Sequence, residues 1–146
     1  MENKRYKPLI DKFYCILATV TLLLVAPPVL ICGIFAPTTL FITVPIFLFA
    51  AYFLITPLVG YVEMRESTVF IRYGFIMTKE IPYVKVRSVE KDRTAISPSL
   101  VSLKNALEHV NIKYNTFDIT TVSVKDNDGF IAELKERCAI ARKGES

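Results

Sequence analysis

Residues 13–62 read FYCILATVTLLLVAPPVLICGIFAPTTLFITVPIFLFAAYFLITPLVGYV. These 50 consecutive residues contain no Asp, Glu, Lys, Arg or His, although 22% of the whole 146-residue chain is charged. A bilayer core requires about 20 apolar residues in a helix, and a soluble core helix does not exclude charge from all of its faces over such a length. Because Pro37 divides the stretch, the sequence predicts a transmembrane helical hairpin at residues 13–60, with spans at 13–35 and 39–60.

The remainder of the chain is polar. Four of the 18 Lys and Arg residues and two of the 14 Asp and Glu residues precede the end of the apolar stretch, which leaves 14 basic and 12 acidic residues after it. We therefore divide the chain into a basic leader (1–12), the hairpin (13–60) and a polar domain (61–146). A nearly balanced domain without a basic stripe does not favour binding of nucleic acid.

The distribution of basic residues predicts the orientation of the hairpin. The turn between the spans has no charge, whereas basic residues border both outer ends: Lys4, Arg5, Lys7 and Lys12 before the hairpin, and Arg65, Arg72 and Lys79 after it. Cytoplasmic loops carry the excess of Lys and Arg, so both termini are expected in the cytoplasm. Aromatic side chains that could anchor the hairpin at the headgroup level are Tyr6, Phe13, Tyr14 and Tyr61.

The apolar stretch has two alternative interpretations. A secretory signal peptide has an apolar region of about 7–15 residues, which is shorter than the first span, and a second span follows here directly. A re-entrant segment that turns back at Pro27-Pro28 stays open, because proline removes helix hydrogen bonds, and it would leave both ends on the same side. Transport is not expected, since the spans contain no ionisable group.

The polar domain reads as antiparallel strands followed by one helix. Apolar and polar residues alternate with the period of two that is typical of strands at residues 60–65, 68–73, 75–81, 84–90, 107–114 and 117–124. Turn signals between them include Ser97-Pro98-Ser99. Asp126 can then cap a helix that presents Phe130, Ile131, Leu134 and Cys138 on one face and an i,i+4 pair of Glu133 and Arg137 on the other. The predicted fold is α+β, a small open barrel closed by a C-terminal helix.

Several segments of the domain resemble the bacterial pleckstrin-homology-like (bPH) proteins that carry two N-terminal membrane helices. The resemblance rests on residues 71–76 (IRYGFI), 86–89 (VRSV), 110–114 (VNIKY), 122–126 (VSVKD) and 129–134 (GFIAEL). It implies a PH-like roll on a membrane stalk in a bacterial plasma membrane. Most members have no assigned activity, and one branch resembles immunity proteins against a secreted peptide bacteriocin, of the sublancin-immunity type. The stretch 93–108 matches least well.

No catalytic, metal or cofactor site is expected. His109 is the only histidine, and no nucleophile, zinc or phosphate-binding motif surrounds it. Asp126, Asp128 and Gly129 lack the later ligands of a calcium loop and fit a helix cap better. The three cysteines show no metal-binding spacing and are expected to act as small apolar residues.

We expect the domain to bind rather than to catalyse. Because it follows the second span almost without a linker, it must lie against the cytoplasmic leaflet and contact a lipid, a membrane protein or a membrane-active peptide. Immunity against a membrane-active peptide bacteriocin is the alternative function. The sequence leaves the oligomeric state open. The residues most suited to anionic lipid or a partner are Arg65, Arg72, Arg87, Lys91 and Arg93.

Overall fold

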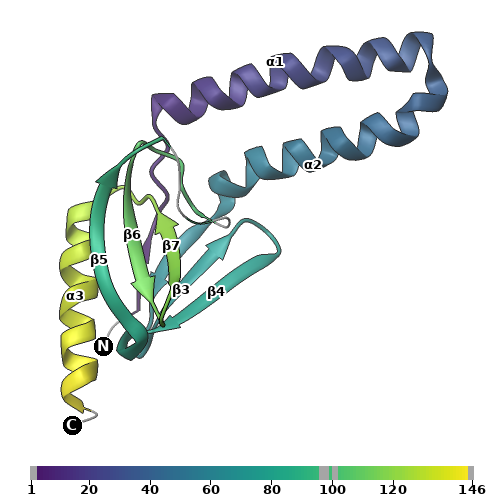
Figure 1. The fold of residues 1–146 in the computed structure, drawn as a ribbon. Helices are drawn as coiled ribbons and strands as arrows, with labels where there is room; N and C mark the ends of the chain where they lie inside the picture. The colour runs from purple at the N-terminus through teal and green to yellow at the C-terminus, as the bar shows by residue number, and fades with distance from the viewer. Residues whose placement is uncertain (1–2, 96–98, 100–101, 145–146) are drawn as a thin grey trace.

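The computed structural model describes residues 3–95, 99 and 102–144. Two long helices form an antiparallel hairpin that projects from a small α+β domain (Figure 1). The hairpin consists of α1 (Lys12–Phe35), the short helix η1 (Pro37–Thr39) and α2 (Leu40–Val59). Both long helices are sufficiently long and apolar to cross a membrane. Since α1 is continuous through Pro27 and Pro28, the chain does not turn back there as the re-entrant alternative required.

The domain contains two antiparallel sheets and a C-terminal helix, which confirms the predicted fold class. One sheet has the strand order β1-β2-β3-β4, and the other has the order β5-β6-β7. The bounds in chain order are β1 (Lys4–Tyr6), β2 (Tyr61–Met64), β3 (Thr68–Tyr73), β4 (Met77–Pro82), η2 (Tyr83–Lys85), β5 (Val86–Arg93), β6 (Glu108–Tyr114), β7 (Asp118–Val122) and α3 (Asn127–Gly144). The predicted turn at Ser97-Pro98-Ser99 lies largely outside the described residues.

Strand β1 comes from the leader, which the sequence analysis had treated only as a basic segment ahead of the membrane. Lys4 pairs with Met64 and Tyr6 with Val62, so β1 extends the first sheet across the hairpin that separates it from β2. Tyr6 is buried, and its ring packs edge-on against Phe130 at 5.1 Å between ring centroids. The prediction that Tyr6 anchors the protein at the membrane surface is therefore wrong, because its ring belongs to the domain core.

The core lies between the two sheets and α3. Strand β3 alternates buried and half-buried residues along its whole length, as the period-two pattern predicted. Side chains with no exposed surface come from all three layers, for example Ile71, Ile112 and Phe130. Burial of each such side chain stabilises the fold by about 1.5–3 kcal/mol relative to leaving it in water.

Helix α3 begins where the sequence predicted. The Gly129 amide donates to Asp126 Oδ1 at 2.9 Å, so Asp126 caps the helix. The pair of Glu133 and Arg137 also forms, with 2.6 Å between Glu133 Oε1 and Arg137 Nη2. It does not lie on a solvent face as predicted, because Arg137 is buried and Glu133 half-buried.

Candidate functional site

The base of the helical hairpin is bonded to the domain through Asn105, in the loop before β6. Its backbone carbonyl accepts a hydrogen bond from the Asp11 amide at 3.2 Å, just before α1. Its side-chain amide donates to the Pro57 carbonyl at 3.1 Å, in the last turn of α2. One buried residue therefore links both ends of the hairpin to the domain.

Asp11 strengthens this junction. One carboxylate oxygen accepts from the Tyr14 amide at 2.9 Å and caps α1, while the other accepts from the Leu107 amide at 2.8 Å. The leader is fixed further by a bridge between Pro8 and Val124. Since only Gly60 separates α2 from β2, the domain is joined to the end of α2 by one residue of chain and to the start of α1 by the hydrogen bonds of Asp11.

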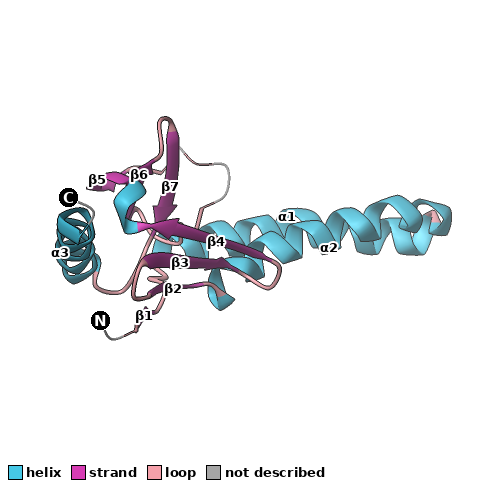
Figure 2. Ribbon diagram, turned by 90° about the horizontal axis from the view of Figure 1, so that it is seen from below, coloured by secondary structure: helices cyan, strands magenta, loops and turns pink. Residues whose placement is uncertain are grey.

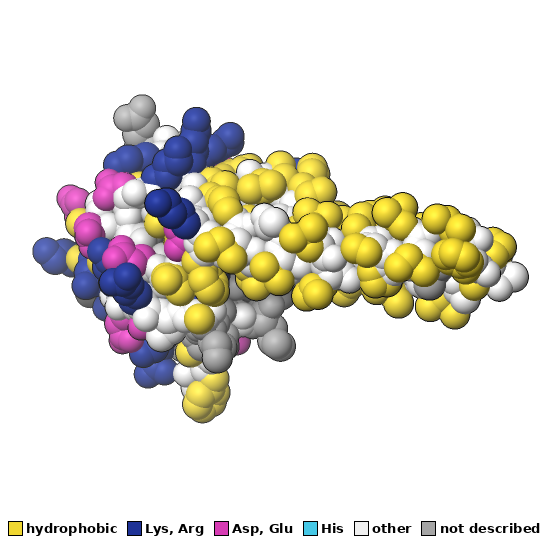
Figure 3. All heavy atoms as spheres, turned by 90° about the horizontal axis from the view of Figure 1, so that it is seen from above, with side chains coloured by type: hydrophobic (Ala, Val, Ile, Leu, Met, Phe, Trp, Pro, Cys, Tyr) yellow, Lys and Arg dark blue, Asp and Glu magenta, His cyan; other side chains and the backbone are white. Residues whose placement is uncertain are grey.

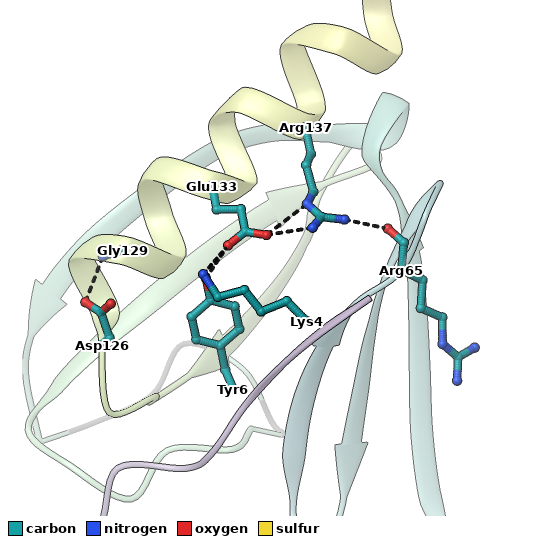
Figure 4. Close-up of polar contacts among 7 residues, drawn as sticks. All are labelled: Lys4, Tyr6, Arg65, Asp126, Gly129, Glu133 and Arg137. Atoms are coloured by element: carbon teal, nitrogen blue, oxygen red, sulfur yellow. Dashed lines mark hydrogen bonds and ion pairs between the residues drawn. The ribbon is translucent and has the colours of Figure 1, made fainter. Parts of the chain in front are cut away.

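The leader is held at the other face of the domain by a charged cluster around Glu133 (Figure 4). Glu133 Oε2 accepts hydrogen bonds from Lys4 Nζ at 2.8 Å and from the Tyr6 hydroxyl at 2.6 Å, while Arg137 approaches Oε1. Arg137 also donates to the Arg65 carbonyl at 3.1 Å. The cluster thus joins α3 to both β1 and the turn after β2.

The electrostatics of this cluster favour the carboxylate form of Glu133. Burial alone would raise the pKa of the Glu133 carboxyl, but the hydrogen bonds from Lys4, Tyr6 and Arg137 outweigh it and lower the pKa to about 2. The hydrogen bond to Glu133 raises the pKa of the Lys4 ammonium. Burial, followed by the hydrogen bond to Glu133, raises the pKa of the Tyr6 phenol. The single carboxylate of Glu133 therefore holds two cations, Lys4 and Arg137, and ties the leader to α3.

The basic residues proposed as lipid or partner contacts do not form one cluster. Arg65 lies in the turn after β2 and Arg72 in β3 of the first sheet, whereas Arg87, Lys91 and Arg93 belong to β5 in the second. Arg65 lies 3.2 Å from Glu80 and 3.6 Å from Glu63. Its guanidinium also covers the Phe70 ring, at 3.9 Å from the centroid. Its charge is therefore already compensated.

Lys91 and Arg87 also have protein partners. Lys91 Nζ lies 3.0 Å from Asp128 and 3.8 Å from Glu108. Arg87 Nη1 donates to the Thr116 carbonyl at 3.2 Å. Arg93 is exposed at the end of β5. The five candidate cations therefore do not form a specific pocket for an anionic headgroup.

The other three aromatic residues predicted as anchors lie close to the base of the hairpin. Phe13 is 38% exposed in the first turn of α1. The prediction that Tyr14 is an interfacial anchor is wrong, because its side chain is buried and its hydroxyl donates to the Leu54 carbonyl of α2. Tyr61 directly follows α2 and lies beneath the Arg5 guanidinium, 4.2 Å from the ring centroid. Arg72 approaches the same ring at 6.0 Å. Tyr61 and Phe13 occupy the level at which the apolar helices end.

An apolar turn that the sequence analysis did not single out lies at this same level. In the turn between β3 and β4, Phe75 and Ile76 are exposed, as is Met77, the first residue of β4, and we call these three residues the β3–β4 tip. The signal was present in the sequence, since a solvent-exposed hairpin turn is normally polar. The alternating pattern assigned these residues to a strand and concealed their exposure.

Two hollows lie at the opposite end of the domain and share Arg87. One has a volume of about 360 Å³ and is lined by Arg87, Ser88, Lys113, Tyr114, Thr116, Phe117, Asp118 and Ile119. The other, of about 320 Å³, separates β5 from α3 and is lined by Val86, Arg87, Ser88, Val89, Lys135, Cys138, Ala139 and Arg142. Phe117 is 92% exposed at the β6–β7 turn. We call these the distal hollows.

His109 is packed inside the domain. It is fully buried, Nδ1 lies 2.8 Å from the Leu107 carbonyl oxygen, and Nε2 lies 3.7 Å from Asp92. Among the described residues, no three or more His, Cys, Asp or Glu side chains come together as a metal site.

The two sheets with a C-terminal helix define a PH-like α+β domain behind a pair of apolar helices. The family model of the bacterial PH domain matches residues 60–138, more than half of the chain, and the chain belongs to this family. The match begins at the last residue before β2 and therefore includes neither β1 nor the hairpin. No curated protein and no solved structure matches the chain.

Proposed function

We propose that this protein is a non-catalytic, membrane-anchored binding module whose bPH domain recognises a protein partner at the cytoplasmic surface of a bacterial plasma membrane. The observation that carries the proposal is the junction at Asn105, which joins both ends of the apolar hairpin to the domain. A domain fixed in this way stays at the membrane surface and presents the same face to the cytosol. Such a geometry suits recognition of a partner beside the membrane.

The charges support a protein partner over a lipid headgroup. Lys and Arg side chains are spread over the domain together with Asp and Glu (Figure 3), and two of the five candidate cations already pair with carboxylates. The distal hollows combine Arg87, which lines both of them, with Lys135 and the exposed ring of Phe117, while Lys113 already pairs with Glu90 at 2.9 Å. Acidic and apolar residues of a partner would complement this surface.

The position of β5 suggests how a partner would bind. Strand β5 is an edge strand of its sheet, and the hollow between β5 and α3 follows that edge. An extended segment can add to an exposed edge and place alternate side chains in adjacent pockets. We therefore propose an extended, acidic segment of a membrane-associated protein as the ligand.

Site-specific photo-crosslinking in native membranes tests this function. A photoreactive amino acid at Lys135, which lines the hollow, should give a discrete crosslinked protein, and Arg87→Gln should reduce its yield several-fold. The same probe at the neighbouring exposed Glu136, which lies outside the distal hollows, is the matched control. Equal crosslinking at both positions, or crosslinks to lipid alone, would contradict recognition of a protein at this site.

The match to the bacterial PH domain does not support an immunity function. In the crosslinking experiment, a short secreted peptide captured at the hairpin rather than at Lys135 would favour that alternative.

A further inference from the structure

The β3–β4 tip is the most apolar exposed turn of the domain as far as the structure describes it. Phe75 is 56%, Ile76 79% and Met77 47% exposed, and the three residues are consecutive. Single apolar residues on a surface are normal, whereas a contiguous exposed group requires an explanation.

The tip is placed beside the last turn of α2. Gly74, at its start, has φ +71°. A Cβ atom there would lie 2.8 Å from Thr56 Cγ2 and 3.0 Å from Thr56 Cα. Only glycine allows both the left-handed backbone and this close approach to the helix. Both ribbon views show the β3–β4 turn extending from the domain in the same direction as the hairpin (Figures 1 and 2).

The length of α2 sets the depth of the tip. Its 20 residues span about 30 Å at 1.5 Å per residue, which is the thickness of a bilayer core. Helix α2 is therefore no longer than the bilayer core is thick. When α2 crosses the membrane, its last turn lies at the boundary between acyl chains and headgroups. Thr56 is in that turn, and the tip beside it reaches the same level.

Backbone carbonyls of the turn are already hydrogen-bonded within the protein, which lowers the cost of moving the turn out of water. Arg72 Nε donates to the Gly74 carbonyl at 2.9 Å, and Nη2 lies 3.4 Å from the Phe75 carbonyl oxygen. These contacts satisfy backbone acceptors that would be costly to bury unpaired. They also place the guanidinium behind the apolar side chains, at the level expected for lipid phosphates.

We propose that the β3–β4 tip inserts into the interface of the cytoplasmic leaflet, where Phe75, Ile76 and Met77 contact acyl chains beside α2. The tip is then a third membrane contact, in addition to the two helices, and it fixes the rotation of the domain about the hairpin. This inference rests on the membrane anchoring in the proposed function. It does not depend on which partner the distal hollows bind.

Depth-dependent fluorescence quenching of the full chain in phosphatidylcholine and phosphatidylglycerol vesicles tests the insertion. After replacement of the native cysteines by alanine, an environment-sensitive label is attached at Ile76→Cys, with Phe117→Cys as the matched control. Like Ile76, Phe117 is an exposed apolar residue in a turn. Strand β6 separates its turn from the hairpin base by about 20 Å, at 3.3 Å per residue. Lipids that carry a quencher on the acyl chain should quench the label at position 76 several-fold more than the label at position 117.

A third label tests membrane anchoring of the hairpin separately from insertion of the β3–β4 tip. Leu24 lies within α1, and Leu24→Cys reports whether the hairpin itself is in the bilayer. Quenching at position 24 with equal, weak quenching at positions 76 and 117 would overturn insertion of the tip and leave the anchored module intact. Absence of quenching at position 24 would overturn the anchoring and with it the inserted tip.

Discussion

The hairpin and the domain use the same apolar residue types in opposite surroundings. In the hairpin, large side chains such as Leu24, Leu30 and Phe41 are exposed. Figure 3 shows hydrophobic side chains over the projecting helices. In the domain, side chains such as Ile71 and Leu134 have no exposed surface. The domain therefore supplies its own apolar environment, whereas in the proposed function lipid supplies one for the hairpin. The same residue type therefore stabilises the fold in the domain and, in the proposed function, holds the protein in the membrane in the hairpin.

The leader lies on the far side of the hairpin in sequence but belongs to the domain in space. Its strand β1 completes the first sheet, and Lys4 and Tyr6 bind Glu133 of α3. Since β1 and Tyr6 are part of the domain core, we expect folding of the domain to require the leader but not the hairpin.

Removing the leader should have the largest effect. A chain that begins at Gly60 lacks β1 and the buried ring of Tyr6, and we expect it to lose resistance to protease. A matched chain in which residues 3–11 are joined to Gly60 by a flexible Gly/Ser linker should recover that resistance without the hairpin. Equal resistance of the two chains, measured by limited proteolysis and circular dichroism, would show that the leader does not stabilise the domain.

Leucine-to-alanine substitutions in the two regions should differ next most strongly. Leu134→Ala removes a fully buried side chain and should lower the free energy of unfolding of the domain by about 2–5 kcal/mol. Leu30→Ala makes the same chemical change at a side chain that is 68% exposed. We expect it to leave the free energy of unfolding of the domain unchanged within about 0.5 kcal/mol. Chemical denaturation in detergent micelles, followed by pulse proteolysis, measures both.

The charged cluster should show a smaller effect that depends on pH. Glu133→Gln should destabilise the domain by about 1–3 kcal/mol near neutral pH, because its partners lose a charged acceptor. The pKa of Glu133 is lowered from 4.5 to about 2 in the folded protein. Its contribution is therefore fully present above about pH 4.5 and is lost as the pH falls towards about 2.

Denaturation at a series of pH values checks that window. The difference in stability between the native chain and Glu133→Gln should shrink below pH 4.5, while Glu136→Gln, at an exposed position three residues further along α3, should differ little from the native chain at any pH. A pH-independent difference for Glu133→Gln would mean that the carboxylate charge is not what holds the leader.

The elements that were predictable from the sequence are those with a strong local signal. The absence of charge over residues 13–62 predicted the helices, period-two alternation predicted β2 to β7, and Asp126 predicted the start of α3. Strand β1 was missed because three residues give too short a pattern, and because its partner β2 lies beyond the whole hairpin. The basic side chains of the leader were also explained by the orientation of the hairpin, since Lys and Arg flank the cytoplasmic ends of membrane spans.

The candidate site was predictable only in part. Residue type identified cations such as Arg65 and Lys91, but long side chains find partners that are distant in sequence, here Glu80 and Asp128. Tyr6 illustrates the same problem, since an aromatic residue beside a span fits either a membrane interface or a core. Glu133 and Arg137 were paired correctly but placed on the wrong face, because helical periodicity does not reveal that β1 covers that side of α3.

The central claim is that the hairpin crosses the membrane and holds the domain at its cytoplasmic surface. Cysteine accessibility in intact cells tests it most directly, with single cysteines placed in a cysteine-free chain at the exposed positions Thr38, in the turn between the helices, and Ser67, in the turn between β2 and β3. A membrane-impermeant maleimide should label position 38 in intact cells and label position 67 only after the cells are opened. Labelling of position 67 in intact cells, with position 38 protected, would contradict the account.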